Sequence, residues 1–229
     1  MHSRLYKNPT PFQHQKVLVV GMGNTGAEVA LDLSNAGIDT SLSVRGPVNL
    51  VPLEFLGRAT QESGMLLDKL PKQLSAILSR LVQKLTIGDL SSYGIKRPAI
   101  AASHQLAETG DTPVIDLGTA KAIKEGKIKV LSGIETFTEN GVQFTNGAVN
   151  NFDVVILCTG YHSKINEFIP GIDSFFDKRG NPRSCIGTGQ WEGLYFPGYD
   201  LFKTGGVLGL IHKESGLIAE EIRQKKSGS

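Results

Sequence analysis

The stretch Lys16-Val17-Leu18-Val19-Val20-Gly21-Met22-Gly23-Asn24-Thr25-Gly26 decides the fold of this chain. Residues 16–20 form a short, mostly β-branched run that ends at a glycine, which is typical of a buried parallel strand. The glycines at 21, 23 and 26 form a G-x-G-x-x-G pattern, and apolar residues at helical spacing follow as far as Asn35. A pattern of this kind between a strand and a helix predicts the turn of an α/β, Rossmann-like dinucleotide-binding domain.

The residues of this turn have separate roles in such a fold. Gly21 permits the tight turn, Gly23 lets the backbone approach a pyrophosphate, and Gly26 lets the helix pack closely on the strand. The helix N-terminus offers free N–H groups and the positive end of its dipole to the phosphates. Asn24 and Thr25 are candidate cofactor contacts, and their side chains also suit helix capping. The alternative is a glycine-rich turn that binds no ligand.

The end of the next strand indicates which dinucleotide is bound. We expect that strand at residues 39–44, and an NAD site usually has Asp or Glu at this point. Here Ser43, Val44 and Arg45 stand there without an acid. An arginine can bind a 2′-phosphate through two parallel, charge-assisted hydrogen bonds. Ser43 and Arg45 are therefore candidate NADPH contacts, and the alternative for Arg45 is a surface arginine at a strand end.

Composition excludes several classes of protein. The 229 residues include 24 basic and 22 acidic ones, a balance that does not suggest nucleic acid or an anionic membrane as partner. Cys158 and Cys185 form no CxxC pair and no metal-ligand spacing, so we expect neither a disulfide scaffold nor a metal site. The N-terminus is polar, and no stretch approaches the roughly 18 apolar residues of a membrane span. We expect a cytoplasmic protein.

Glycine is unusually frequent, at 27 residues or about 12% against about 7% in average proteins. The excess predicts many turns and close backbone approaches. Further strands are expected at 128–131, 135–138, 142–145 and 153–158, with hairpin turns between the middle ones, and a short helix near 119–125. The C-terminal part is expected to contain a loop-rich stretch over 162–192, a strand at 193–198, a glycine-dense loop at 205–209 and a helix near 213–224.

An amphipathic helix is predicted over residues 71–87, between two stretches, 48–64 and 89–113, that are expected to be irregular. Its apolar stripe consists of Leu74, Ile77, Leu78, Leu81 and Leu85. We expect this stripe to face the protein core. Its polar face includes Lys72, Arg80 and Lys84, which leaves peripheral contact with a membrane surface as the alternative.

Three motifs resemble those of the class B flavin-containing monooxygenases. Residues 21–26, with Asn24, resemble the NADPH motif of that family. Residues 159–161, Thr-Gly-Tyr, look like its ATGY element, with Cys158 in place of alanine. Four residues match the second half of the identifying motif F-x-G-x-x-x-H-x-x-x-(Y/F)-(K/R)-x-x-x-(P/D), namely His2, Tyr6, Lys7 and Pro11. The Phe and Gly of that motif are absent because the chain begins one residue before the histidine.

Within the family the chain is similar to the plant YUCCA group of indole-3-pyruvate monooxygenases. Residues 93–98, 112–116 and 126–130 carry this similarity, together with Gly193-Leu194-Tyr195 followed by Gly198. The segment 200–204 departs from the pattern, which leaves the flavin contacts there undefined. The resemblance implies auxin biosynthesis, with NADPH and FAD as cofactors, O₂ and a small 2-oxo acid as substrates, and no nucleic acid. It also implies that the flavin carries the chemistry, so we nominate no catalytic side chain.

The ends of two further segments are candidate cofactor contacts. Thr159, Gly160 and Tyr161 follow a parallel strand at its C-terminal end, where ligands bind in open α/β sheets, although a structural crossover between domains is the alternative. Gly198 is a candidate through the family resemblance. Cys158 is expected to be a small buried residue rather than a nucleophile. We expect His104, His162 and His212 to lie on the surface or to pack in the interior without a catalytic role. Trp191 and Tyr195 are expected to serve ordinary packing, with a place near a flavin as the alternative.

The expected domains are a linker at 1–15, an NADPH-binding domain of parallel sheet and β-meander at 16–160, and the C-terminal portion of a FAD-binding domain at 161–229. Such enzymes carry an earlier G-x-G-x-x-G for FAD, and fifteen residues before Lys16 are too few for a strand, turn and helix. We therefore expect little FAD to be retained. An inactive NADPH-binding module that pairs with a full-length relative is the alternative function, and the missing CxxC argues against a disulfide reductase. The oligomeric state is left open.

Overall fold

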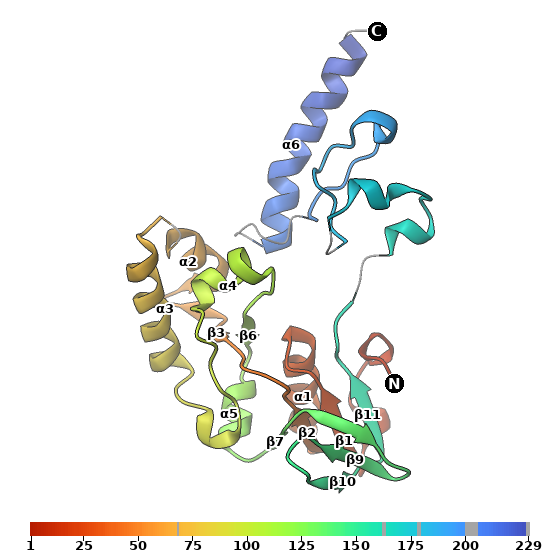
Figure 1. Cartoon of the computed structure of the whole chain (residues 1–229). Coiled ribbons are helices and arrows are strands. Elements are labelled where there is room, and N and C mark those ends of the chain that lie inside the picture. Colours follow the sequence, from red (N-terminus) through yellow and green to blue (C-terminus); the bar gives the residue numbers. More distant parts are fainter. Residues whose placement is uncertain (68, 162–163, 178–179, 200–205, 228–229) are drawn as a thin grey trace.

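A four-stranded parallel sheet forms the centre of the chain before residue 160 (Figure 1). Its strands, in spatial order, are β11 (Val154–Leu157), β1 (Lys16–Val20), β2 (Asp39–Ser43) and β7 (Ile128–Leu131). Each neighbouring pair runs parallel. The computed structural model describes residues 1–67, 69–161, 164–177, 180–199 and 206–227. The sheet confirms the predicted Rossmann-like fold class.

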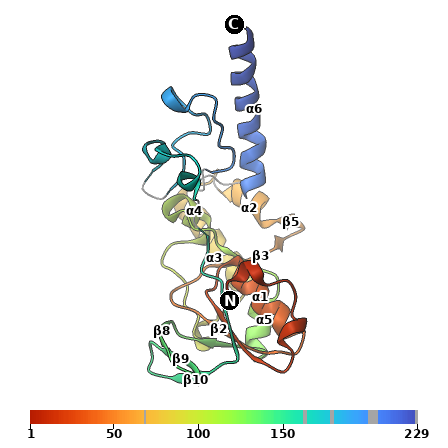
Figure 2. The same cartoon turned by 90° about the vertical axis from the view of Figure 1, so that its right-hand side faces the viewer.

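The two faces of this sheet are covered by different elements. Helices α1 (Asn24–Asn35) and α5 (Thr119–Lys124) pack on one face, and an antiparallel meander of β8 (Ile134–Phe137), β9 (Gly141–Phe144) and β10 (Val149–Asn151) covers the other (Figure 2). Side chains alternate along a strand, so Val17 and Val19 point to the helices while Leu18 packs with Val142 and Phe144. The predicted strands at 135–138 and 142–145 are these meander strands, each shifted by one residue.

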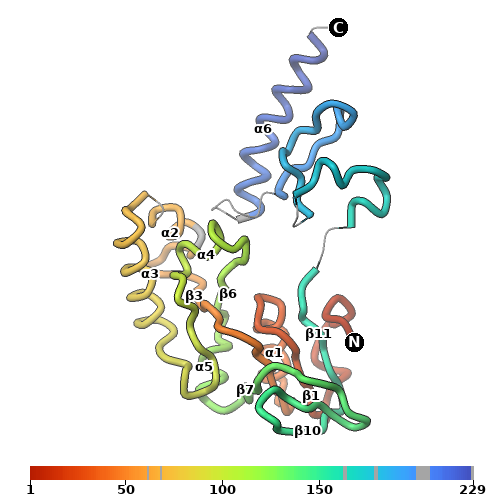
Figure 3. Tube along the Cα trace, viewed as in Figure 1, coloured from red at the N-terminus to blue at the C-terminus, as the bar shows by residue number. Residues whose placement is uncertain are grey.

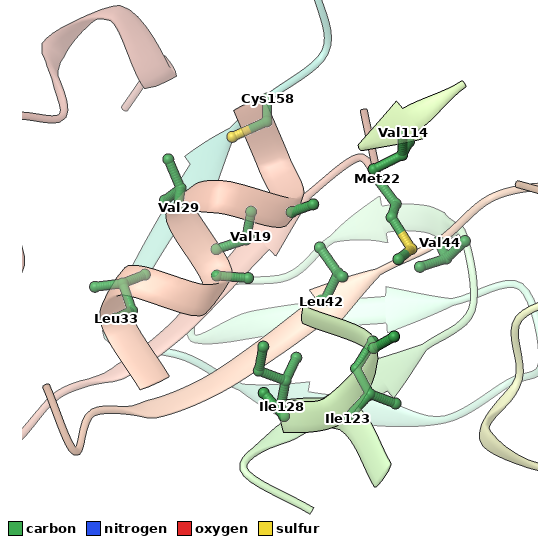
Figure 4. Close-up of a cluster of buried hydrophobic side chains, with 14 of the residues drawn as sticks. Val19, Met22, Val29, Leu33, Leu42, Val44, Val114, Ile123, Ile128 and Cys158 are labelled. Carbon is green, nitrogen blue, oxygen red and sulfur yellow. The ribbon is translucent and has the colours of Figure 1, made fainter. Parts of the chain in front are cut away.

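Figure 4 shows the core between the sheet and its helices. It gathers buried side chains from three strands, α1 and α5, including Val19, Leu33, Leu42, Ile123 and Ile128. Met22 and Val114 close the core at the carboxyl ends of the strands. The helix that follows the glycine turn is therefore fixed by close packing on β1 and β2.

The N-terminal segment packs on the edge of the sheet. It contains two 3-10 turns, Ser3–Leu5 and Thr10–Phe12. The Met1 ammonium donates to the Val155 carbonyl at 2.7 Å, and the Leu157 N–H donates to the Met1 carbonyl at 2.8 Å, which extends the sheet beyond β11. Tyr6 donates from its hydroxyl to Asp32 on α1 at 2.7 Å, and burial together with this carboxylate raises the pKa of Tyr6 above its usual range. Residues of the expected linker thus hold the sheet edge and α1 together.

A helical part is inserted between β2 and β7, where irregular segments were expected. It contains β3 (Leu50–Pro52) paired with β6 (Val114–Asp116), the hairpin β4 (Glu54–Phe55) and β5 (Arg58–Ala59), α2 (Thr60–Leu67), α3 (Lys72–Thr86), a 3-10 turn at Ser91–Tyr93 and α4 (Ala102–Thr109). The expectation of irregular structure at 48–64 and 89–113 was wrong. Two- and three-residue strands and eight-residue helices carry too little periodicity to be recognised.

Helix α3 forms where predicted but faces the opposite way. The expected core residues Leu74, Ile77, Leu81 and Leu85 are 44, 63, 49 and 70% exposed. The buried face instead carries three polar residues at intervals of four, Ser75, Ser79 and Gln83. Gln83 donates from Nε2 to the Leu50 carbonyl at 2.8 Å and to Asn49 Oδ1 at 3.2 Å. Of the three, Gln83 ties the inward face of the helix to the segment 49–50, whereas the buried Ser75 hydroxyl has no hydrogen-bond partner among the described residues.

The C-terminal part consists of loops and one long helix, α6 (Gly206–Ser227), which extends away from the sheet (Figures 1 and 3). Its loops carry 3-10 turns at Ile165–Glu167, Ile172–Phe175 and Gly189–Trp191. They enclose a small core of Ile165, Ile172, Phe175 and Phe196. The expected strand at 193–198 is only an isolated bridge between Ile186 and Tyr195, and residues 206–209 of the expected loop belong to α6. No helix among the described residues is long and apolar enough to cross a bilayer.

Because the apolar side chains of α3 face outward, substituting one of them should cost far less stability than substituting a core leucine of α1. Leu33→Ala removes a fully buried side chain of the core and should lower the free energy of unfolding by about 2–5 kcal/mol. Ile77→Glu changes a side chain of α3 that is already exposed to water, and it should alter the free energy of unfolding by less than about 0.5 kcal/mol. Urea unfolding followed by circular dichroism measures both. Equal destabilisation by the two variants would show that the stripe is buried after all.

Candidate functional site

The glycine turn between β1 and α1 is shaped by backbone contacts at two of its three glycines. A Cβ at Gly26 would lie 1.8 Å from the Gly21 carbonyl oxygen. Gly21 has a φ of +101°, and a Cβ there would lie 2.6 Å from the carbonyl oxygen of Cys158. These two glycines are required because the helix, the turn and the end of β11 approach one another closely. Backbone packing alone therefore explains why both positions require glycine.

Gly23 differs from these two glycines, because no protein atom approaches it closely. It is exposed, forms the N-cap of α1, and a Cβ built on it meets no atom within 4 Å. Its φ of −90° is accessible to any residue, so neither strain nor packing requires glycine here. The space in front of Gly23 is free of protein atoms, as expected where a pyrophosphate approaches the backbone.

The first turn of α1 leaves backbone donors next to this space. Among the described residues, no group accepts a hydrogen bond from the N–H groups of Asn24, Thr25 and Gly26. Neither Asn24 nor Thr25 is the N-cap, because that position belongs to Gly23. The Asn24 side chain instead accepts from the Ile115 N–H on β6 at 2.7 Å. What these residues offer an anion is therefore their backbone N–H groups and the positive end of the helix dipole.

The parallel register brings other predicted residues to the same edge of the sheet. Val20 is paired with Ser43 on β2 and with Leu157 on β11, so the chain leaves all three strands side by side. Arg45 is exposed and forms no ion pair with any described residue. Ser43, in contrast, is buried, and its hydroxyl donates to the Ser132 carbonyl at 2.8 Å. Arg45 is thus available to a ligand, whereas Ser43 holds β2 to the segment after β7.

Residues 158–161 continue this edge beyond β11. Thr159, Gly160 and Tyr161 are exposed, and the Tyr161 ring lies 5.1 Å from the His2 ring in an edge-on arrangement. Cys158 is buried, and burial raises the pKa of its thiol to about 11. A thiol that stays protonated at neutral pH is a poor nucleophile. This agrees with the expectation that Cys158 serves packing.

Gly198 lies in another part of the structure. Its N–H donates to the Glu214 carboxylate of α6 at 2.7 Å, and a Cβ on it would lie 2.8 Å from Ile211 Cγ1. It joins the C-terminal loops to α6 and is not brought to the glycine turn. Trp191 packs against the core of the C-terminal loops, His104 is half-buried on α4, and His212 is exposed on α6. His162 and the divergent segment 200–204 lie outside the described residues.

A cavity of about 240 Å³ lies beside Asn24, between the helices and strands of the inserted part. Its walls are mainly apolar and come from α2, α3, α4, β3, β6 and their connections, including Val51, Phe55, Leu67, Val82, Leu106 and Ile115. Ser103 lines it, and its hydroxyl oxygen is buried with no hydrogen-bond partner among the described residues. Sequence reasoning missed this cavity because it assigned its walls to irregular segments.

Comparison with known proteins identifies the family. Residues 1–174 match the family model described as flavin-binding monooxygenase-like. The indole-3-pyruvate monooxygenase YUCCA4 of Oryza sativa subsp. japonica is 40% identical over 226 residues, which cover 98% of this chain and 51% of the relative. The probable indole-3-pyruvate monooxygenase YUCCA3 of Arabidopsis thaliana is 36% identical over 99% of this chain and 53% of the relative. The chain spans about half the length of the curated relatives it matches.

Solved structures agree with the fold. A flavin-containing monooxygenase from Stenotrophomonas maltophilia superposes with a TM-score of 0.58 at 15% identity, over 99% of this chain and 54% of that one. The bacillithiol disulfide reductase YpdA of Staphylococcus aureus gives 0.56 at 18% identity, over 96% and 54%. At such identities the likeness concerns the fold alone. The sequence matches confirm the resemblance to the YUCCA group of flavin-binding monooxygenases, which are oxidoreductases. The chain therefore belongs to the flavin-binding monooxygenase-like family.

Proposed function

We propose that this chain is the NADPH-binding part of a YUCCA-type monooxygenase. Its reaction would be the oxidative decarboxylation of a 2-oxo acid, indole-3-pyruvate, to indole-3-acetate with O₂. The names of the relatives support the substrate. The observation that carries the proposal is the protein-free space in front of Gly23, next to backbone donors without partners and at the sheet edge that also bears Arg45.

The chain's own residues would bind and orient NADPH. The N–H groups of Asn24, Thr25 and Gly26 would donate to the pyrophosphate, and the α1 dipole would favour its negative charge. Arg45 would bind the 2′-phosphate, and exposed Thr159 and Gly160 add backbone groups at the same edge. The sequence contains no second G-x-G-x-x-G, and the described residues include no comparable cradle for FAD, so we assign no step at the flavin to a residue of this chain.

The cavity beside Asn24 supports a small, largely apolar ligand. Pockets for such ligands combine apolar walls with a few polar groups that fix orientation. The partnerless Ser103 hydroxyl could accept a hydrogen bond from an N–H such as that of an indole ring. Thr60, Ser63 and Gln83 add further polar atoms to the lining. We propose that the cavity accommodates the ring of the substrate.

The role of Gly23 is tested by Gly23→Ser. Serine is a better N-cap than glycine and its side chain has room in the protein, so stability should be unchanged or slightly higher. The same side chain occupies the space proposed for the pyrophosphate, so NADPH should bind at least about tenfold more weakly, a loss of about 1.4 kcal/mol. Titration calorimetry measures the affinity and thermal unfolding the stability. Unchanged affinity would place the dinucleotide elsewhere.

The role of Arg45 is tested by comparing two dinucleotides. Arg45→Ala removes the charge-assisted interaction with the 2′-phosphate, which we expect to contribute about 1.5–3 kcal/mol in total, so NADPH affinity should fall about tenfold to a hundredfold. NADH lacks this phosphate, so its affinity should stay the same and serves as the internal control. Arg58→Ala, at another exposed arginine on β5, is the matched control variant. Equal losses for NADPH and NADH would contradict the assignment of Arg45.

The alternative function is an inactive NADPH-binding module that acts with a full-length relative. We expect the purified chain to bind NADPH and to retain little FAD. Oxygen uptake with NADPH, indole-3-pyruvate and added FAD separates the two functions. Indole-3-acetate formed with the oxygen consumed supports a monooxygenase. NADPH binding without oxygen uptake supports the module, and a stoichiometric flavin absorbance would contradict the expected loss of FAD.

A further inference from the structure

The exposed apolar face of α3 has no partner among the described residues. This face, which we call the α3 stripe, consists of the exposed Leu74, Ile77, Leu81 and Leu85 and the half-buried Leu78, and Leu70, two residues before the helix, is also exposed. Helix α3 packs on α4 and β3 and lies at the outer margin of the inserted part, with the sheet on its far side (Figure 1). A row of large apolar side chains along a 15-residue helix is unusual on a surface that faces only water.

The outward orientation of the α3 stripe is fixed by the interior. Gln83 bonds to both Asn49 and the Leu50 carbonyl, and the side chains of Ser75 and Ser79 are small enough to let the helix approach its neighbours. Rotating α3 to bury the leucines would break these bonds. The Asn49 side chain and the Leu50 carbonyl would then lie against apolar leucine side chains without the hydrogen bonds that Gln83 gives them. The stripe therefore cannot be hidden by turning the helix.

The charged side chains of α3 itself are all positive. Residues 69–88 contain four basic residues, Lys69, Lys72, Arg80 and Lys84, and no acid, although the whole chain carries a net charge of only +2. Residues three or four apart are neighbours on a helix, so Arg80 and Lys84 flank the stripe beside Ile77 and Leu81. At the C-terminal end of α3, Arg97 and Lys124 donate to the carbonyls of Gly88 and Ile87, and Arg97 there faces the exposed carboxylate of Asp89.

We propose that the α3 stripe binds the surface of an anionic lipid bilayer. An amphipathic helix with leucines on one side and Lys or Arg on its flank lies in the interface, with its apolar face at the acyl boundary and its cations among the headgroups. The opposite flank of α3 is held against the protein, so the helix would lie on the bilayer as the contact face of a folded part. This lipid site is independent of the proposed reaction.

The charges favour a bilayer over a second copy of the chain. A symmetric dimer through the α3 stripe would place the same patch of both copies face to face. Arg80 and Lys84 of one copy would then approach those of the other, and no acid in residues 69–88 could compensate them. Anionic headgroups supply the missing negative charge, and each basic residue near the membrane surface adds to the attraction.

Co-sedimentation with vesicles tests the proposal. The chain should sediment with vesicles of phosphatidylcholine and phosphatidylserine at 3:1 and bind them at least about tenfold more tightly than pure phosphatidylcholine vesicles, less so at high salt. Ile77→Glu combined with Leu81→Glu should abolish sedimentation. Lys72→Gln combined with Lys84→Gln should remove the preference for phosphatidylserine. Circular dichroism of each variant shows that it remains folded.

Leu208→Asp is the matched control, because this leucine is 82% exposed on α6, away from the stripe. It should leave vesicle binding unchanged. If this variant also lost vesicle binding, the binding would not depend specifically on the α3 stripe, and the proposal would be overturned. Absence of sedimentation would overturn it too. Sedimentation velocity without lipid covers the remaining outcome: a dimer that Ile77→Glu and Leu81→Glu dissociate would assign the stripe to a second copy instead.

Discussion

The close approach of α1 to the carboxyl ends of β1 and β11 is the constraint on which the rest of the structure depends. Gly26 permits it, since a Cβ there would lie 1.8 Å from the Gly21 carbonyl oxygen, and Gly21 permits the neighbouring contact with Cys158. The approach sets the N-terminus of α1 at the sheet edge and leaves the space at Gly23 unfilled. Two glycines thus serve packing, and the third gains its functional meaning only because those two have placed it.

The dinucleotide turn and the inserted part are joined through one side chain. Asn24 begins α1 and accepts from the Ile115 N–H of β6, so the strand that lines the cavity is tied to the N-terminus of α1. This hydrogen bond therefore joins the cavity wall directly to the helix terminus at which we propose that the phosphates bind.

Sequence reasoning succeeded where one local rule determines the answer. Residues 16–26 predicted a strand, a turn and a helix because the glycine spacing demands all three, and the predicted strand at 128–131 is β7. It failed over 48–64 and 89–113, where short elements are stabilised by contacts distant in sequence. Residues 50–52 form a strand because they pair with residues 114–116, and no periodicity within either segment reveals that partner. The position of Arg45 was predictable, whereas the cavity was not.

Helix α3 shows why amphipathicity alone does not say which face is buried. The hydrophobic pattern fixed the helix and its bounds to within a residue, yet the leucines point outward. An apolar stripe on a helix favours an apolar environment. The sequence pattern does not indicate whether that environment is the protein interior or a partner outside the chain. Here the interior next to α3 offers Asn49 and the carbonyl of Leu50, which need hydrogen bonds that leucines cannot make and Gln83 can. The cost of leaving those groups unpaired therefore decides the orientation, and the leucines are left to whatever lies outside the chain.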